Sequence, residues 1–261
     1  MQKFALIGSG RVPSHLAPAI VHGGIACTGV WSRTYAHAEA LARKLDTAAT
    51  AGLGDFIRRA SDSGAEALLI SVTDDAIPII ASALPRDLNI PVVHTSGSTP
   101  LEVLAPLPNR GVLYPMQTFS GERKIEISEV PFFLEYNTDK AGDALKAFTE
   151  AIGAKNVRTI TSEERVRLHL AAVFGCNFVN HLYALASKTL EGTSIPFSSL
   201  APLLSETLAK ALSFDPKTVQ TGPAVRRDSL TIERHLALLR KEDPSLAEVY
   251  DLLTRSIQNL S

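Results

Sequence analysis

The sequence has few cysteines and no excess of charge of either sign, and both absences exclude classes of protein. Its 261 residues include only Cys27 and Cys176, with no CxxC pair, which argues against a disulfide framework and against a structural zinc site. The 26 Lys and Arg residues are matched by 27 Asp and Glu residues, so the chain lacks the basic excess of a nucleic-acid binder. We therefore expect no metal site and no nucleic-acid partner.

The sequence also lacks a recognisable targeting segment and an uninterrupted apolar run of membrane-spanning length. The opening residues, MQKFALIGSG, enter a predicted strand at once, without the regions that make up a secretory signal peptide. No apolar run approaches the roughly 20 residues needed to cross a bilayer. With 45% hydrophobic and 20% charged residues, the composition is that of a globular protein with a core. These observations predict a cytoplasmic protein with no membrane partner.

The first 160 residues alternate between short apolar runs and helical patterns. Residues 3–7 (KFALI) end at Gly8, residues 11–22 have helical spacing, and residues 25–31 again resemble a strand, which together have the size of a βαβ unit. The alternation continues with strands at 67–72, 91–94, 131–135 and 157–160 and helices at 35–44, 55–60, 75–84 and 140–152. Continuously apolar strands between helices are typical of a parallel sheet covered on both faces. The predicted fold is α/β, a Rossmann-type doubly wound and mainly parallel sheet.

From residue 162 onward the sequence predicts only helices. The first, at 162–191, begins with a Ser162 cap, and further helices are expected at 197–211, 228–241 and 245–258. We place a Rossmann dinucleotide-binding domain at residues 1–160 and an all-α domain, for substrate binding and dimerisation, at 161–261. The long helix is apolar over most of its circumference, and the other helices are too few to cover it. This pattern predicts a homodimer formed through the helical domain.

The segment GSGRVP at residues 8–13 follows a predicted strand and opens a predicted helix, which is the context of a dinucleotide-binding turn. Gly8 allows a tight turn, and Gly10 allows the backbone to approach a pyrophosphate held at the helix N-terminus. Pro13 stands where a third glycine is expected and removes one N–H group. The alternative is a glycine turn with a purely structural role.

The end of the second predicted strand indicates which dinucleotide would bind. An NAD site usually carries Asp or Glu there, whereas this chain has Ser32, Arg33 and Thr34. Arg33 can pair with a 2′-phosphate and the two hydroxyl groups can donate to it, which favours NADP. The alternative is an exposed Arg33 without a specific contact. Thr73 and Asp74 follow another strand at the same sheet edge and are expected to face the cofactor, unless Asp74 or its neighbour Asp75 caps the next helix.

Two further groups of polar residues are candidates for chemistry. The segment HTSGS at 94–98 offers an imidazole and hydroxyl groups where the nicotinamide is expected. In the long helix, His169, Asn177 and Asn180 fall close to one stripe. One alternative is a core histidine with satisfied hydrogen bonds and asparagines that form interhelical amide bonds, because an unsatisfied buried polar group would cost about 1–3 kcal/mol. The other is a polar stripe that faces a cleft between the domains.

The whole layout resembles the superfamily of 6-phosphogluconate dehydrogenase, β-hydroxyacid dehydrogenase and pyrroline-5-carboxylate reductase. More closely, it is similar to a family that pairs a Rossmann-like domain with a helical domain of unknown function and is described as NADP oxidoreductases. The resemblance runs from Phe4 to about Leu239. It rests on GSGRV (8–12), VWSR (30–33), HTSGS (94–98), YPMQTF (114–119), AAVFGCNFVNHL (171–182) and TGPAVRRD (221–228).

The resemblance implies an NADP-dependent oxidoreductase that transfers hydride to or from a small carbonyl, imine or hydroxy-acid substrate. It implies cofactor contacts at Gly8, Ser9, Gly10, Arg11, Val12, Ser32 and Arg33, and a cleft lined by Ser96, Gln117, His169 and Asn177. Val173 and Phe174 stand where the dehydrogenases carry a catalytic lysine, so their proton-transfer mechanism does not carry over. His169 is then the best candidate for a general acid or base. The alternative is a non-catalytic NADP-binding sensor or scaffold protein.

Overall fold

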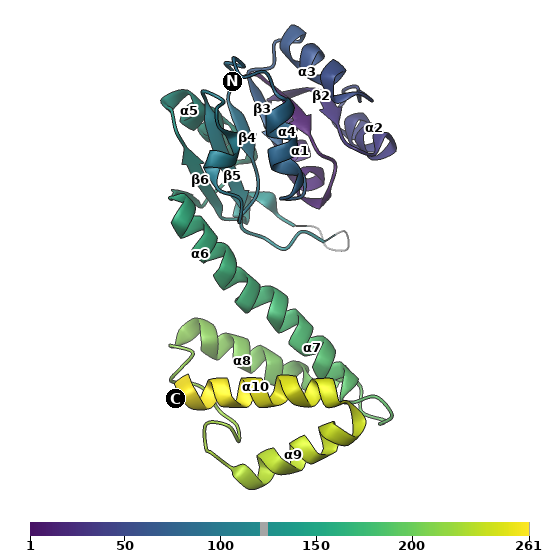
Figure 1. Ribbon diagram of the computed structural model, residues 1–261, viewed down its shortest axis with the longest axis vertical. Coiled ribbons are helices and arrows are strands. Elements are labelled where there is room, and N and C mark those ends of the chain that lie inside the picture. Colours follow the sequence, from purple (N-terminus) through teal and green to yellow (C-terminus); the bar gives the residue numbers. More distant parts are fainter. Residues whose placement is uncertain (121–124, 261) are drawn as a thin grey trace. The chain divides into compact units, whose positions relative to one another are not determined.

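The computed structural model describes residues 1–120 and 125–260, and the chain divides into two compact units, Met1–Cys176 and Asn177–Ser261 (Figure 1). The first unit contains all the described strands. The predicted boundary near Thr161 falls at the start of helix α6 (Ser162–Ala172), which belongs to the first unit. The assignment of residues 1–160 and 161–261 to two functional domains stays a prediction.

In the part of the chain that the structure describes, seven strands form one sheet in the order β2-β1-β3-β4-β5-β6-β7. Strands β1 to β5 run parallel, β6 is antiparallel to β5, and β7 is parallel to β6. This confirms the predicted Rossmann-type, mainly parallel sheet. Strand β5 was not among the predicted strands. The strands are β1 (Lys3–Ile7), β2 (Ala26–Trp31), β3 (Ala67–Ile70), β4 (Val92–His94), β5 (Arg110–Pro115), β6 (Phe132–Tyr136) and β7 (Val157–Thr159).

Helices cover both faces of the sheet because successive side chains of β1 point to opposite sides, and both sides are apolar. Phe4 packs in one core cluster with α1 (Arg11–His22), α2 (Tyr35–Lys44) and α5 (Asp139–Ile152). Its neighbour Ala5 packs in a second cluster with α3 (Leu53–Asp62) and α4 (Ala76–Ala83). The described residues of this unit also form two short 3₁₀ helices, η1 (Leu101–Leu104) and η2 (Ile127–Glu129).

The strand order reverses beside β1, because β2 lies on one side of it and β3 on the other. In open α/β sheets, ligands bind beyond the carboxyl ends of the strands at such a switch point. The segments that follow β1, β2, β3, β4 and β5 all leave the sheet at this edge. The topology therefore gathers five loops around one place.

The helical run that begins at Ser162 contains a break that the sequence did not predict. Helix α6 passes into a π-helical segment, η3 (Val173–Phe178), and then into α7 (Val179–Lys188). Its cap is also one residue earlier than expected: Thr161 Oγ1 accepts from the Glu164 N–H, and the Glu164 carboxylate accepts from the Thr161 N–H, a capping box. Ser162 cannot serve as the cap because its hydroxyl donates to Glu135, 2.6 Å away.

The rest of the second unit consists of η4 (Phe197–Leu200), α8 (Ala201–Ser213), α9 (Ser229–Glu242) and α10 (Pro244–Leu260). Helices α9 and α10 pack through Ile232, Leu236 and Ala247. By contrast, the described residues of α7 and α8 include no buried side chain. The second unit thus has a small core and much uncovered apolar surface.

Within the described residues, the helical run Ser162–Lys188 is long and apolar enough to cross a membrane by length and composition. This corrects the expectation that no run approaches that length, because residues 168–187 contain no Asp, Glu, Lys or Arg. Two histidines and two asparagines interrupt the apolar sequence, which is why it does not read as a continuous hydrophobic run. Composition of this kind does not by itself distinguish a membrane helix from a helix covered by protein.

Candidate functional site

The turn after β1 requires glycine at its first position for reasons of packing. Gly8 has a φ of +118°, and its N–H donates to the Trp31 carbonyl, 2.7 Å away. A Cβ atom at Gly8 would lie 1.9 Å from the carbonyl oxygen of Ser71, at the end of β3. Any other residue would force β1 and β3 apart, so this glycine is explained by the sheet alone.

The start of α1, in contrast, has the geometry and the free donors that suit an anion. Helix α1 begins after Gly10, and no side chain caps it. A Cβ atom at Gly10 would meet no atom within 4 Å. The first N–H groups of a helix lack partners inside the helix, and the helix dipole favours negative charge there. The open space and the uncapped N–H groups of Arg11 and Val12 fit a pyrophosphate.

The end of β2 lies against this turn. The Ser9 hydroxyl donates to the Ser32 hydroxyl at 2.8 Å, which joins the glycine turn to the predicted ribose-binding segment. Arg33 and Thr34 follow directly, and both are exposed. Thr34 occupies the N-cap position of α2, but its side chain makes no cap hydrogen bond. A guanidinium and two hydroxyl groups in this position fit the 2′-phosphate of NADP.

The loops after β3 and β4 are joined by side-chain hydrogen bonds. The hydroxyl groups of Ser71 and Thr95 lie 2.9 Å apart, and Ser98 donates to the Asp74 carboxylate. Asp74 therefore links the two loops. Asp75 stands at the N-cap position of α4 without a side-chain cap hydrogen bond, so the capping alternative for this pair is wrong. Thr73, which precedes these two residues, is exposed.

Ser96 is buried and organises the loop after β4. Its hydroxyl donates to Thr99 Oγ1 at 2.9 Å and accepts from the Thr99 N–H, also at 2.9 Å. Its own N–H donates to Nδ1 of His94 at 3.1 Å. The hydrogen bonds of Ser96 thus stabilise the conformation of the loop.

His94 does not offer an accessible imidazole, contrary to expectation. Its side chain is fully buried, because β4 is a central strand of the sheet. Burial and, to a smaller extent, the nearby Arg165 charge lower the pKa of His94 to about 3, and the Asp74 charge opposes this shift. The ring is therefore neutral at physiological pH and cannot exchange protons with a ligand there.

This buried histidine should make folding stability depend on pH. Above about pH 6.5 the ring is neutral in both states; between pH 6.5 and about 3 only the unfolded chain binds the proton, so stability falls as pH falls. Through this group, we expect the wild-type chain to lose about 2 kcal/mol of folding stability between pH 7.5 and 5.0. We expect His94→Asn, whose amide oxygen can still accept from Ser96, not to show this loss. Urea unfolding followed by the fluorescence of Trp31, the single tryptophan, measures this. His22→Asn, at an exposed position, should keep the wild-type dependence.

His169 lies against the loop after β4, within the first unit. Its side chain is half-buried, and its Nδ1 is 3.2 Å from the Tyr114 hydroxyl. A Cβ atom at Gly97 would lie 2.6 Å from the same nitrogen. The structure thus brings His169 beside the segment that contains Ser96.

A buried ion pair, which sequence reasoning missed, fixes this arrangement. Arg165 is fully buried, and one of its terminal nitrogens lies 2.8 Å from the Glu135 carboxylate. The other terminal nitrogen donates to the carbonyl oxygens of Ser96 and Gly97, at 3.0 and 3.2 Å. The spacing in the sequence could have indicated Arg165, because this residue precedes His169 by four positions and so shares its face of α6.

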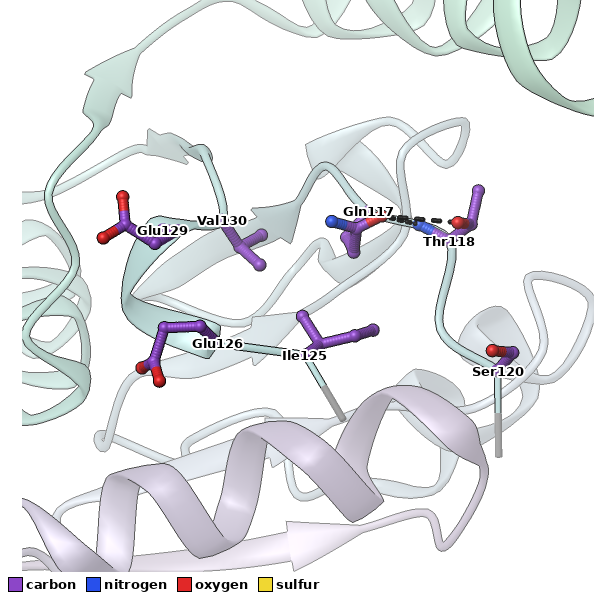
Figure 2. Close-up of a pocket in the computed structure, with 7 residues that line it drawn as sticks. All are labelled: Gln117, Thr118, Ser120, Ile125, Glu126, Glu129 and Val130. Atoms are coloured by element: carbon purple, nitrogen blue, oxygen red, sulfur yellow. Dashed lines mark hydrogen bonds between the residues drawn. The ribbon is translucent and has the colours of Figure 1, made fainter. Parts of the chain in front are cut away.

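Gln117 lines a pocket to which Ser96 does not contribute. This pocket has a volume of about 340 Å³, and the side-chain oxygen of Gln117 accepts from the N–H of Thr118 at 2.8 Å. Figure 2 shows the carboxylates of Glu126 and Glu129 pointing away from the Gln117 amide. The pocket is lined by Gln117, Thr118, Ser120, Ile125, Glu126, Glu129 and Val130.

Asn177 is exposed and begins the second unit, within the π-helical segment. Such segments are rare in proteins overall, but those that occur are often found at functional sites. An i→i+5 segment turns less per residue than an α-helix, so the expected stripe through His169, Asn177 and Asn180 does not follow α-helical spacing. The role of Asn177 stays a prediction.

Residues 2–118 match the Rossmann-like domain family, and residues 130–257 match the family described as a domain of unknown function, DUF2520. No curated protein matches the chain. A Bacteroides fragilis structure described as "putative NADP oxidoreductase BF3122" is 37% identical with a TM-score of 0.83, and the match covers 99% of this chain and 98% of that one.

Two Aspergillus terreus enzymes share the fold at lower identity. A reductive aminase in complex with NADPH and ethyl-5-oxohexanoate is 14% identical with a TM-score of 0.73, covering 100% of this chain and 98% of that one. An imine reductase in complex with NADPH4 and dibenz[c,e]azepine is 16% identical with a TM-score of 0.65, at the same coverage. At these identities the likeness is one of fold.

Proposed function

Because this chain belongs to the family that joins a Rossmann-like domain to the helical DUF2520 domain, we propose that it is an NADP-dependent oxidoreductase. Its substrate is a small carbonyl, imine or hydroxy acid. The observation that carries the proposal is the open, uncapped start of α1, joined through Ser9 and Ser32 to an exposed Arg33. The similar structures described as an NADP oxidoreductase or as complexes with NADPH or NADPH4 support the choice of cofactor.

In this proposal the loops at the sheet edge hold the dinucleotide. The N–H groups of Arg11 and Val12 bind the pyrophosphate, and Gly8, Ser9 and Gly10 leave room for it. Ser32, Arg33 and Thr34 bind the 2′-phosphate. Thr73 and Asp74 lie at the neighbouring strand end, where the topology supports a contact with the rest of the cofactor.

The bound cofactor supplies a hydride, and the protein must manage the proton. His169 is the proposed acid or base, because a half-buried imidazole beside the Ser96–Gly97 segment can reach both solvent and ligand. In the direction of reduction, protonated His169 gives the Nε2 proton to the substrate oxygen or nitrogen. Asn177 and Gln117 are proposed to orient the substrate, and Ser96 is proposed to contribute by shaping the loop after β4.

Cofactor choice gives the first test. We expect Arg33→Ala to weaken NADPH binding by about 10- to 150-fold, because removal of a charge-assisted hydrogen bond costs about 1.5–3 kcal/mol. NADH binding should change little, since NADH has no 2′-phosphate. Titration calorimetry with both cofactors measures this. Arg86→Ala, at an exposed arginine after the C-terminus of α4, is the matched control and should bind NADPH as wild type does. Equal wild-type affinities for NADPH and NADH would contradict the proposal.

A panel of compounds then tests for turnover. NADPH oxidation would be followed with small ketones alone, with the same ketones plus a primary amine, and with preformed cyclic imines. Oxidation by one class identifies the substrate chemistry. If NADPH binds but no class is reduced, the chain is instead a non-catalytic NADP-binding protein.

We also propose that the chain forms a homodimer through its helical domain. Helices α7 and α8 bury none of their described side chains, yet α8 exposes Leu203, Leu208 and Leu212. Leu208 and Leu212 are four residues apart and therefore share a face. Apolar surface of this extent is normally covered by another protein surface. A second copy of the same helices is the covering that we propose.

We expect the wild-type chain to sediment as a dimer at micromolar concentration and Leu212→Asp to raise the dimer dissociation constant at least about tenfold, since each buried leucine contributes about 1.5–3 kcal/mol. Ile79→Asp is the control, because Ile79 is equally apolar and exposed but lies on α4. Analytical ultracentrifugation measures both. A wild-type monomer at all concentrations, or flotation of the chain with phosphatidylcholine vesicles, would overturn the proposal.

A further inference from the structure

Two aromatic side chains from distant parts of the first unit meet beside the loop after β4. The Tyr114 hydroxyl lies 3.2 Å from His169 Nδ1, and the two ring planes make an angle of 69°. We infer that Tyr114 is a positioning residue: its oxygen accepts a hydrogen bond from Nδ1–H of His169 and thereby makes Nε2 the nitrogen that exchanges the proton. This inference rests on the proposed function, in which His169 is the acid or base.

The environment holds the pair in a single arrangement. Tyr114 is 8% exposed, and a Cβ atom at Gly97 would lie 2.8 Å from its ring and 2.6 Å from His169 Nδ1. The backbone at Gly97 therefore packs directly against both side chains. Neither ring can turn toward that side without moving the loop.

The loop in turn is held by the buried Arg165. Its guanidinium donates to the carbonyl oxygens of Ser96 and Gly97 and also pairs with Glu135 on β6. Because Arg165 lies one turn before His169 on α6, the same side chain fixes the helix and the loop. Strand, loop and helix thus meet at the tyrosine–histidine pair.

The chemistry explains why one nitrogen must be held. A histidine that both gives and takes a proton at Nε2 needs the proton on Nδ1 kept in place by an acceptor. Among the described residues, Tyr114 is the hydrogen-bond partner of Nδ1, and Nε2 has none. Burial raises the pKa of Tyr114, so the phenol keeps its own proton, and the lone pairs of its oxygen are available to accept from Nδ1–H.

The proton step balances with the cofactor as the source of the hydride and with water as the final source of the proton. Protonated His169 starts with Nδ1–H bound to the Tyr114 oxygen and Nε2–H directed to the substrate. The substrate carbon gains the hydride, and its oxygen or nitrogen takes the Nε2 proton. His169 is then neutral, with its remaining proton on Nδ1, and water returns a proton to Nε2.

Nitrogen NMR of the full-length chain tests this pairing without a substrate. With ¹⁵N-labelled histidine at pH 8, we expect neutral His169 to carry its proton mainly on Nδ1, the minor form of free histidine. Its signals would be assigned from the spectrum of His169→Gln. Tyr114→Phe, which removes one oxygen and keeps the ring, should move the proton mainly to Nε2. A wild-type proton on Nε2, or no change in Tyr114→Phe, would overturn the inference.

The second unit provides a matched control. His235 Nδ1 lies 2.9 Å from the Tyr250 hydroxyl, so Tyr250→Phe removes the same kind of hydrogen bond elsewhere. It should change the His235 signals and leave those of His169 unchanged. The wild-type spectrum alone tests the inference if Tyr114→Phe does not fold.

Turnover separates this inference from the proposed function. With a compound that the panel shows to be reduced, Tyr114→Phe should lower kcat about 10- to 100-fold and leave the NADPH Kd unchanged. In a His169→Ala background the same substitution should have no further effect, because Tyr114 acts through His169. Additive losses would overturn the inference, whereas a panel without turnover would overturn the proposed function and leave the NMR result standing.

Discussion

We expect His169→Ala to lower turnover of the reduced panel compound by about 10²- to 10⁴-fold, the usual contribution of a positioned acid or base. The NADPH Kd should stay nearly unchanged, because the dinucleotide is proposed to bind the loops after β1 and β2. Among the described residues, the hydrogen-bond partner of His169 is Tyr114 on β5, which belongs to neither loop. Steady-state kinetics and calorimetry on the same preparations measure the two effects separately.

The comparison for this substitution is His22→Ala. His22 is an exposed histidine at the last position of α1, at the opposite end of that helix from the proposed pyrophosphate-binding residues. It should keep wild-type turnover and wild-type NADPH affinity. If His169→Ala keeps more than a tenth of wild-type turnover, another group moves the proton and the assignment of His169 is wrong.

Arg165→Ala should destabilise the first unit by about 3–5 kcal/mol, the range expected when one partner of a buried ion pair is removed. The substitution leaves the Glu135 carboxylate, whose side chain is 12% exposed, without its cation. It also leaves the carbonyl oxygens of Ser96 and Gly97 without the donor that they share. Urea unfolding followed by Trp31 fluorescence reports on this unit.

Arg167→Ala is the internal control, because Arg167 is two residues away and also pairs with a carboxylate. Both members of its pair with Glu163 are 77% exposed, and exposed pairs contribute little to stability. The double substitution Arg165→Met with Glu135→Leu should recover part of the loss, since it removes both buried charges. Equal stability of Arg165→Ala and Arg167→Ala would show that the buried pair is not important for folding.

The Rossmann-type sheet could be predicted because its information is local. Continuous apolar runs such as KFALI and ALLI bury both faces, and each is followed by a turn and a helix. The sequence did not predict strand β5, because RGVLYP begins with a charged residue and contains Gly111 and Pro115, which weaken a strand pattern. Its place in the sheet comes from pairing with β4 and β6.

Local hydroxyl and imidazole groups were harder to assign, because several residues could fill the same role. Thr161 and Ser162 are both suitable caps for α6. The choice between them depends on Glu135 on strand β6, which accepts a hydrogen bond from the Ser162 hydroxyl. His94 belongs to a loop motif in the sequence, but the neighbouring strands bury it completely. Burial depends on the strand order and cannot be read from five residues.

By itself, the sequence determined the fold class, the glycine turn, the Ser32-Arg33-Thr34 segment and the candidacy of His169. Each of these depends on residues close together in the chain, where spacing and residue type decide the geometry. Only the tertiary structure joined Tyr114, Glu135 and Arg165 to His169 and to the Ser96–Gly97 backbone. These contacts come from β5, β6, α6 and the loop after β4, and no periodicity relates their positions. They depend on which strands lie side by side in the sheet. The buried Arg165 charge and the Tyr114 hydroxyl are tolerated there because each has a hydrogen-bond partner on a different element.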